Sequence, residues 1–431
     1  MHAASAELVI RGARVWAGQG AAQRADVLVR DGRIAQLGVA LQAAPDAAAI
    51  EAPGALVLPG LADAHAHFEL RSCSKPWCPA ARSHARSDTP PDSPPTEPRH
   101  AERALAQRIA RGATHVRAYV EIGTGPDLAA LHRALAAREA LRDVVDLQLA
   151  AVAQRSANGT TDAAAMLDLL DQAAQQGAAV IGAIEPAAAG PSTGDTAPLD
   201  ALFAIASRRG CRLDFALRDG GAADVVRIER IIERTRALGL AGRVSIGHAS
   251  VLGLLAPQRL DTIAARLAEQ RITLMTLAPG GGTPQPPLRR LVELGVSVVT
   301  GSDGAPDEPA MPGPGDMLER AYLVAYVNGL RRDADLQLAL HMASIAGARL
   351  IGGAEHGVVV GCAADLLIVD AASAAEAVLC RPPRRWVIKR GRVVARDGLP
   401  MPAVAAGLPC RRAAAQAAHA TAHPPGQAPA G

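Results

Sequence analysis

Apolar runs and helix-like periods alternate along the chain between residues 101 and 303. Apolar positions at helical spacing predict helices at 101–111, 128–141, 163–176, 199–209, 225–238 and 259–270. Short apolar runs predict strands at 114–120, 144–152, 178–184, 212–217, 243–248, 272–278 and 297–303. Together with the run that ends at His67, these make eight strands that alternate with helices. This order predicts an α/β fold, a (β/α)8 TIM barrel with its site at the strand ends. A doubly wound open sheet is the alternative, but the Gly-rich phosphate turn that would favour it is not present in the sequence.

Both ends of the chain have β character. Residues 7–17 and 25–37 are rich in β-formers, and Asp31-Gly32 is a strong hairpin signal. Residues 357–370 predict a turn and a buried strand, and 385–396 predict a hairpin about Arg390-Gly391. These segments predict one small β-sandwich domain built from both chain ends. The predicted division is 1–58 and 351–398 for the sandwich, 59–350 for the barrel and 399–431 for a disordered tail.

A long segment at 71–100 interrupts the predicted barrel. Ser, Pro, Asp and Arg dominate it, so we expect a loop rather than a packed element. Loops of this length in a compact domain are functional or disordered. Because the segment leaves the first barrel strand just after His67, we interpret it as a lid or pocket wall over the site, with plain disorder as the alternative.

Charge and composition favour small-molecule chemistry. The formal net charge of the 431 residues is +3, and acidic and basic residues are well mixed, so we expect neither nucleic acid nor a membrane as a partner. The scattered cysteines favour a reducing compartment. The sequence has no apolar run of about 20 residues and no leader pattern, which predicts a cytoplasmic protein. It leaves the oligomeric state open, a homo-oligomer included.

Polar residues stand where several predicted barrel strands end. His65 and His67 lie two residues apart, so both imidazoles face the same side of their strand. Gln154 follows the third strand, His248 ends the sixth and Asp303 ends the eighth. Each of these is an ordinary strand-end or turn residue when taken alone. In a barrel all of them meet at one mouth, and histidines with a carboxylate then predict a divalent metal site.

At this point the sequence resembles a known family, the amidohydrolase superfamily, and within it bacterial cytosine deaminase and its triazine-hydrolysing relatives. The resemblance rests on the order of features along the chain: early β-strands, a strand that ends in H-x-H, a (β/α)8 barrel, a late Asp and a closing hairpin. It covers nearly the whole chain to about Gly398. The matching pieces are residues 112–117, Asp146 to Leu149 with Gln154, 182–184, 243–248, 301–303 and 357–370.

The resemblance implies a role for each of these site residues. It makes His65, His67 and Asp303 ligands of zinc or iron. It matches Gln154 to the amide that binds the edge of the substrate ring, and His248 to the histidine beside the metal-bound hydroxide. In such enzymes the metal lowers the pKa of a bound water, and a carboxylate carries the proton to the departing amine.

Strand five departs from the family pattern. Ala216 stands where the family has a metal-binding histidine, and alanine cannot coordinate a metal. Asp219 stands where the family has its catalytic glutamate, so a carboxylate remains with a shorter reach. Arg218 precedes it and is expected to lower its pKa. The chain also has few aromatic residues, and the region after Asp303 has none at the position where the family stacks one on the substrate.

Three interpretations follow. The first is an active metal-dependent hydrolase of non-peptide C–N bonds, a cytosine-deaminase-like deaminase of a small cyclic or amide compound, with Asp219 as proton shuttle and His248 beside the hydroxide. The second is a catalytically degenerate barrel that binds a small molecule or acts as a scaffold. The third is a differently metallated hydrolase in which Asp219, or less favourably the deeper Asp214, replaces the missing ligand.

Overall fold

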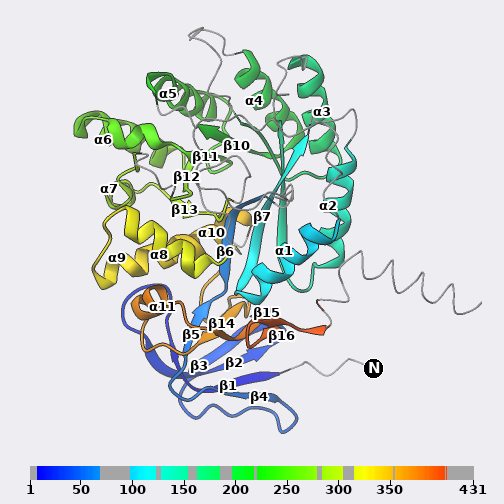
Figure 1. Cartoon of the computed structure of the whole chain (residues 1–431), viewed down its shortest axis with the longest axis vertical. Helices are drawn as coiled ribbons and strands as arrows, with labels where there is room; N and C mark the ends of the chain where they lie inside the picture. The colour runs from blue at the N-terminus through cyan, green and yellow to red at the C-terminus, as the bar shows by residue number, and fades with distance from the viewer. Residues whose placement is uncertain are drawn as a thin grey trace, which may run out of the picture.

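Two β-sheets organise the protein. The computed structural model describes residues 7–67, 98–122, 128–153, 163–184, 197–217, 221–278, 284–303, 315–352, 355–402 and 404. One sheet lies in the helix-covered part of the molecule, and the other lies beside it and contains both the first and the last strands of the chain (Figure 1).

The larger unit is a parallel barrel. Its eight strands pair in sequence order from β6 to β13, with parallel register throughout. An open doubly wound sheet reverses its strand order at a switch point, and this sheet has no such reversal, so the barrel prediction is confirmed. The strands are β6 Leu61–His67, β7 Ala113–Ile122, β8 Asp146–Ala153, β9 Val180–Ile184, β10 Arg212–Leu217, β11 Val244–His248, β12 Thr273–Thr276 and β13 Val298–Thr300.

The barrel closes between its first and last strands, just beyond β13. Ala66 and Asp303 form a parallel bridge. The Asp303 N–H donates to the His65 carbonyl at 2.8 Å, and the His67 N–H donates to the Asp303 carbonyl at 3.0 Å. The closing hydrogen bonds therefore lie among the predicted metal ligands.

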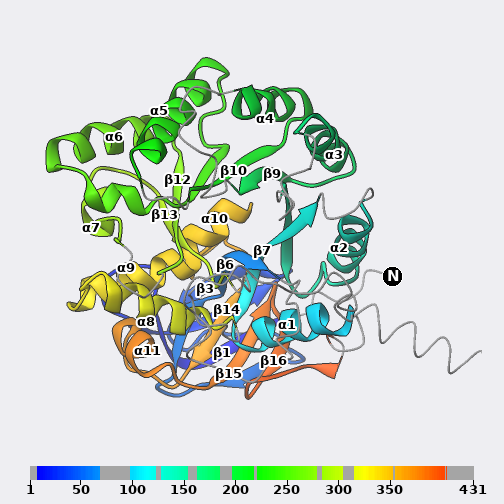
Figure 2. The same ribbon diagram turned by 45° about the horizontal axis from the view of Figure 1, so that its top comes forward.

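Helices surround this barrel on its outside (Figure 2). Each of the six helices predicted between the strands is present, with ends within three residues of the prediction. After the last barrel strand, the helical spacing of residues 336–350 predicts one further helix, and the structure has α9 and α10 there, joined by a π turn at Met342–Ala346. Helices α7, α8 and α11 were not predicted. The helices are α1 Pro98–Ala110, α2 Ala129–Ala140, α3 Ala163–Gln175, α4 Ala197–Arg209, α5 Ala222–Ala237, α6 Pro257–Glu269, α7 Leu288–Glu293, α8 Met317–Val327, α9 Asp333–His341, α10 Gly347–Ile351 and α11 Ala374–Cys380.

The smaller sheet combines both chain ends, as predicted. Strand β14 pairs with β5, so the late strands continue the sheet that the early strands begin. Both predicted hairpins are present, and Asp31-Gly32 and Arg390-Gly391 have positive φ at both residues, as a two-residue type I′ turn requires. The strands are β1 Leu8–Val15, β2 Gln23–Arg30, β3 Arg33–Gly38, β4 Ala48–Glu51, β5 Leu56–Pro59, β14 Leu366–Val369, β15 Arg384–Lys389, β16 Arg392–Arg396 and β17 Leu399–Pro400.

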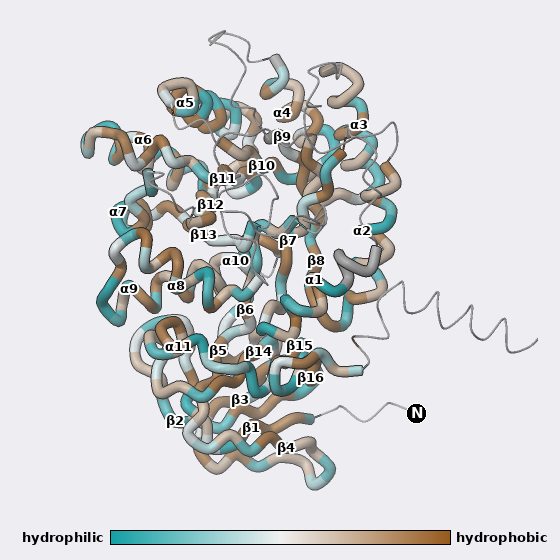
Figure 3. Tube along the Cα trace, viewed as in Figure 1, coloured by the Kyte–Doolittle hydropathy of each residue, from teal (hydrophilic) through white to brown (hydrophobic). Residues whose placement is uncertain are grey.

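The middle of this sheet, at β5 and β14, is buried on both faces. In β14, Leu366 and Ile368 belong to the core of the small domain, whereas Leu367 and Val369 pack into the core shared with the barrel. Because successive side chains point to opposite faces, a strand covered on both sides reads as a continuous apolar run. Figure 3 shows this as hydrophobic colour along the strands of both sheets, with mixed colour on the outer helices.

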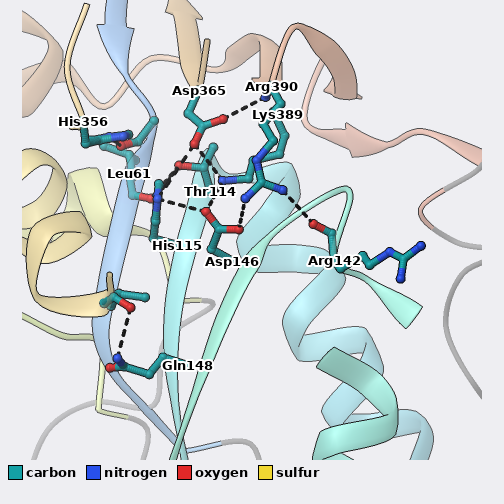
Figure 4. A network of polar contacts seen from close by, with 12 residues as sticks. Leu61, Thr114, His115, Arg142, Asp146, Gln148, His356, Asp365, Lys389 and Arg390 are labelled. Atoms are coloured by element: carbon teal, nitrogen blue, oxygen red, sulfur yellow. Dashed lines mark hydrogen bonds and ion pairs between the residues drawn. The ribbon is translucent and has the colours of Figure 1, made fainter. Parts of the chain in front are cut away.

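A buried ionic cluster joins the small domain to the barrel (Figure 4). The Lys389 ammonium, on β15, lies 2.7 Å from both Asp146 at the start of β8 and Asp365 beside β14. The His115 Nε2 lies 3.2 Å from Asp146. The His356 Nε2 lies 2.8 Å from the Gly60 carbonyl, at the point where the chain enters the barrel.

Two predictions fall largely outside the described residues. Residues 71–97 of the predicted loop and most of the tail at 399–431 belong to the part of the chain that the structure does not describe, whereas residues 98–100 form the start of α1 rather than loop. Strand β17 pairs with β16 and Val404 is buried, so the small domain continues past residue 398. We propose to place the first domain boundary at Gly60, between β5 and β6.

Candidate metal centre

Strand β6 brings two histidines to one point. His65 and His67 lie on the same face of the strand, and their side chains are 1% and 3% exposed. Their Nε2 atoms are 3.0 Å apart. Imidazole nitrogens this close, in a site shielded from water, are suited to share one metal ion.

Asp303 completes a group of three donors. Its Oδ1 lies 3.7 Å from the His65 Nε2 and 3.9 Å from the His67 Nε2, and its side chain is fully buried. Zinc bonds of about 2.0–2.2 Å in tetrahedral geometry place ligand atoms about 3.3–3.6 Å apart. The three separations lie close to this range, so the donor set fits a divalent cation in both chemistry and spacing.

The residues just before Asp303 hold it against β6, the first strand of the barrel. Asp63 is fully buried and accepts hydrogen bonds from the Ser302 N–H at 2.8 Å, the Ser302 hydroxyl at 2.6 Å and Arg108 Nε at 3.1 Å. A Cβ on Gly301 would lie 2.4 Å from the His65 Cβ, so only glycine lets the two strands approach this closely. The donor geometry is therefore built into the barrel closure.

Two residues on β7 line the centre and were not predicted. The ring of Tyr119 lies 3.8 Å from the His65 ring and 5.2 Å from the His67 ring, centroid to centroid. Glu121 Oε1 lies 3.7 Å from His67 Nδ1, the ring nitrogen on the side away from the metal donors. A carboxylate in that place orients a ligating imidazole. The signal for both was their spacing of two residues along the strand from Arg117, which puts all three on the inner face of one strand.

The fifth strand of the barrel, β10, presents no donor at the predicted ligand position, which Ala216 occupies. Ala216 is buried between Gly247 on β11 and Ile184 on β9. Two residues earlier, Asp214 accepts hydrogen bonds from the Tyr119 hydroxyl and from Ser245 Oγ, and Arg117 lies 3.8 Å away. Among the described residues, the donor group at the mouth consists of His65, His67 and Asp303 and does not include Asp214.

Burial and the charge of Asp214 hold the pKa of Tyr119 well above its usual value. Its phenol is therefore neutral at ordinary pH and acts as a hydrogen-bond donor. Its hydrogen bond to Asp214 joins β7 to β10, the second and fifth strands of the barrel.

His248 lies beside this group rather than in it. It ends β11 beside Leu217 of β10, and its backbone is left-handed with φ 65°. Its ring lies 6.3 Å from the His65 ring, in an edge-on orientation. Gln154 and Asp219 lie outside the described residues. Their strands β8 and β10 end at Ala153 and Leu217, on the same edge of the barrel as the donor group.

Comparisons with known proteins give consistent matches. A model described as the amidohydrolase family matches residues 80–395. The N-isopropylammelide isopropyl amidohydrolase of Pseudomonas sp. (strain ADP) is 27% identical over 360 residues, 81% of this chain and 88% of that protein. The crystal structure of N-isopropylammelide isopropylaminohydrolase from Burkholderia multivorans is 34% identical, with a TM-score of 0.81 over 92% of this chain and 100% of that one.

A more distant structure shares the fold. The 5-methylcytosine deaminase of Klebsiella pneumoniae is 23% identical, with a TM-score of 0.73 over 90% of this chain and 97% of that one. These matches confirm the predicted resemblance and the predicted class of enzyme, a hydrolase of non-peptide C–N bonds. None of the helices in the described ranges is long and apolar enough to cross a membrane.

Proposed function

Because the chain belongs to the amidohydrolase family, we propose that it is a metal-dependent hydrolase that removes an amino or alkylamino group from a small nitrogen heterocycle. The observation that carries this proposal is the convergence of His65, His67 and Asp303 at the barrel mouth. Zinc and iron both accept imidazole and carboxylate ligands, and either suits this donor set. When bound, such an ion lowers the pKa of a water and so supplies a hydroxide nucleophile at neutral pH.

The remaining roles follow from position. We assign proton transfer to Asp219, because β10 ends two residues before it on the edge of the barrel that carries the donors. We assign to His248, whose ring lies 6.3 Å from the His65 ring, a hydrogen bond with the attacking oxygen. Gln154 directly follows β8, and an amide offers both a donor and an acceptor to a ring with nitrogen and carbonyl groups.

Metal content and amine release test the proposal together. We expect the purified protein to contain stoichiometric zinc or iron, and Asp303→Asn and His67→Ala to reduce that content strongly. His132→Ala, an exposed histidine on α2, is the matched control and should retain the metal. Ammonia or alkylamine release is then measured with amino- and alkylamino-substituted pyrimidines and triazines. Absence of metal from the wild-type protein, or release that is equal in wild type and Asp303→Asn, would contradict the proposal.

A second candidate function is a catalytically silent barrel that binds a small molecule. Ala216 favours it, because a centre with three protein ligands holds its metal less tightly than one with four. Replacement Ala216→His separates the two. Gain of metal affinity together with first appearance of turnover supports the silent barrel, whereas turnover already present in the wild-type protein rejects it.

A further inference from the structure

A pocket of about 600 Å³ that is open to solvent, called the cavity below, lies at the end of the barrel opposite the metal donors. It is formed where strands β9, β10 and β11 begin. Its polar lining consists of three arginines and one amide: Arg209, Arg212, Arg243 and Gln148. Strand β10 runs from Arg212 to Leu217, so the cavity and the mouth are about 16 Å apart along the strand at about 3.3 Å per residue. The cavity is therefore a separate place from the proposed catalytic site.

Two of these arginines direct charge into the cavity without a carboxylate to balance it. Arg212 donates to the Gly242 carbonyl at 3.2 Å, and Arg243 donates to the Cys211 carbonyl at 2.9 Å. Neither forms an ion pair within the described ranges. A guanidinium has five N–H donors, so most of the donors on each side chain remain available after these single bonds.

The local field is positive. Burial lowers the pKa of Arg212, and the charges of Arg117 and Arg243 lower it further. Arg209 differs, because Asp171 accepts two hydrogen bonds from it at 2.9 and 2.6 Å. Arg212 and Arg243 thus repel one another in a partly dehydrated place, and an anion between them would relieve that repulsion.

We propose that this cavity binds a small multivalent anion, a compound that carries phosphate or carboxylate groups, between Arg212 and Arg243. The planar guanidinium matches the oxygens of both groups and bonds them in pairs. The positive charge of the lining disfavours cations. The proposal does not depend on the catalytic proposal, since none of these residues lies at the mouth.

Titration of the full-length protein tests it. Inorganic phosphate and citrate are titrated at constant ionic strength, with chloride as the reference anion, and heat of binding and the unfolding temperature are recorded. We expect saturable binding and a rise in unfolding temperature with at least one of the two anions. Arg212→Gln and Arg243→Gln should each weaken that binding at least tenfold.

Matched variants keep the result interpretable. Arg24→Gln removes the same charge from an exposed position on β2 and should bind the anion as the wild type does. Arg212→Lys keeps the charge without the fork and should give an intermediate affinity. Circular dichroism of each variant without anion establishes that it is folded.

Three outcomes would overturn the proposal. The first is no saturable binding by the wild-type protein up to tens of millimolar anion. The second is equal affinity in the wild type and in folded Arg212→Gln and Arg243→Gln. The third is binding that disappears when the metal is removed with a chelator but persists in both arginine variants, because the anion would then occupy the metal centre.

Discussion

The main chain of Asp303 is hydrogen-bonded to that of His65, with the Asp303 N–H donating to the His65 carbonyl at 2.8 Å. The same residues offer the side-chain oxygen and nitrogen that stand 3.7 Å apart in the donor group. Closure of the barrel and assembly of the centre are thus one structural event. A change that loosens the closure is expected to reduce metal binding even if no ligand is altered.

Replacement Asp63→Asn tests this link by removing a buried charge next to the closure. Asn has nearly the shape of Asp but removes the carboxylate charge that faces the buried Arg108 and Ser302. Breaking a buried ion pair costs about 3–5 kcal/mol, so we expect a loss of that size in urea unfolding, with reduced metal content. Asp261→Asn, which disrupts an exposed pair with Arg290, should cost at most about 1 kcal/mol. Equal losses in the two variants would show that Asp63 does not hold the closure.

Replacement Gly301→Ala tests the same link by adding a methyl group where the two strands are in close contact. The added Cβ would lie 2.4 Å from the His65 Cβ and 2.6 Å from the His65 nitrogen, so the two strands must separate. We expect a destabilisation of about 1–3 kcal/mol and a weaker affinity for zinc in a competition titration. Gly247→Ala is the control, since its Cβ would meet its nearest neighbour at 3.7 Å. Wild-type zinc affinity in a folded Gly301→Ala protein would refute the argument.

The Tyr119 hydroxyl and ring have different expected roles. Tyr119→Phe removes the donor to the buried Asp214 but keeps the ring against His65, so it should cost about 1–3 kcal/mol of unfolding free energy and retain the metal. Tyr119→Ala also removes the ring and should weaken metal binding. Tyr326→Phe, at a side chain that is largely exposed, should change neither quantity. Metal affinity that is the same in Tyr119→Ala and Tyr119→Phe would show that the ring does not position the imidazoles.

The barrel order, and the strand ends that carry His65, His67 and Asp303, could be predicted from sequence because each depends on local pattern. The strand at Arg212–Leu217 was predicted to the residue from its apolar run, and the two hairpins from Asp31-Gly32 and Arg390-Gly391. The roles of Tyr119 and Glu121 could not be predicted in this way. They depend on how β7 pairs with β6, where Tyr119 stands opposite His67. That register joins residues 52 positions apart in the chain, since His67 pairs with Tyr119.

Ion pairs between residues far apart in the chain could not be predicted from the sequence either. Lys389 looks like a surface residue of a hairpin, yet it is fully buried because Asp146, more than 200 residues earlier, starts the strand above it. Helix α8 was missed because it follows a Pro- and Gly-rich stretch that predicts irregular chain. Strand pattern predicts which residues are inside an element, whereas the contacts between elements require the folded arrangement.

The buried histidines of the ionic cluster predict how stability depends on pH. Burial, together with the nearby His115, lowers the pKa of His356 to about 3, and burial lowers that of His115 although Asp146 opposes the effect. In the unfolded chain a histidine gains its proton near pH 6.5. Between these values the unfolded state binds more protons than the folded state, so the free energy of unfolding falls as the pH falls. The contribution is complete above about pH 7 and is lost progressively toward pH 3.

Replacement His356→Gln isolates this contribution. Its amide N–H can still donate to the Gly60 carbonyl, the bond that His356 makes at 2.8 Å (Figure 4), but it does not titrate. Urea unfolding at pH 7, 6, 5 and 4 should show a slope smaller than that of the wild type, by up to about 1.4 kcal/mol per pH unit for one buried histidine. His132→Gln, at an exposed position, should retain the wild-type slope. If His356→Gln kept that slope as well, the folded protein would have to accommodate a proton on His356, and the cluster would then be hydrated rather than sealed between the two domains.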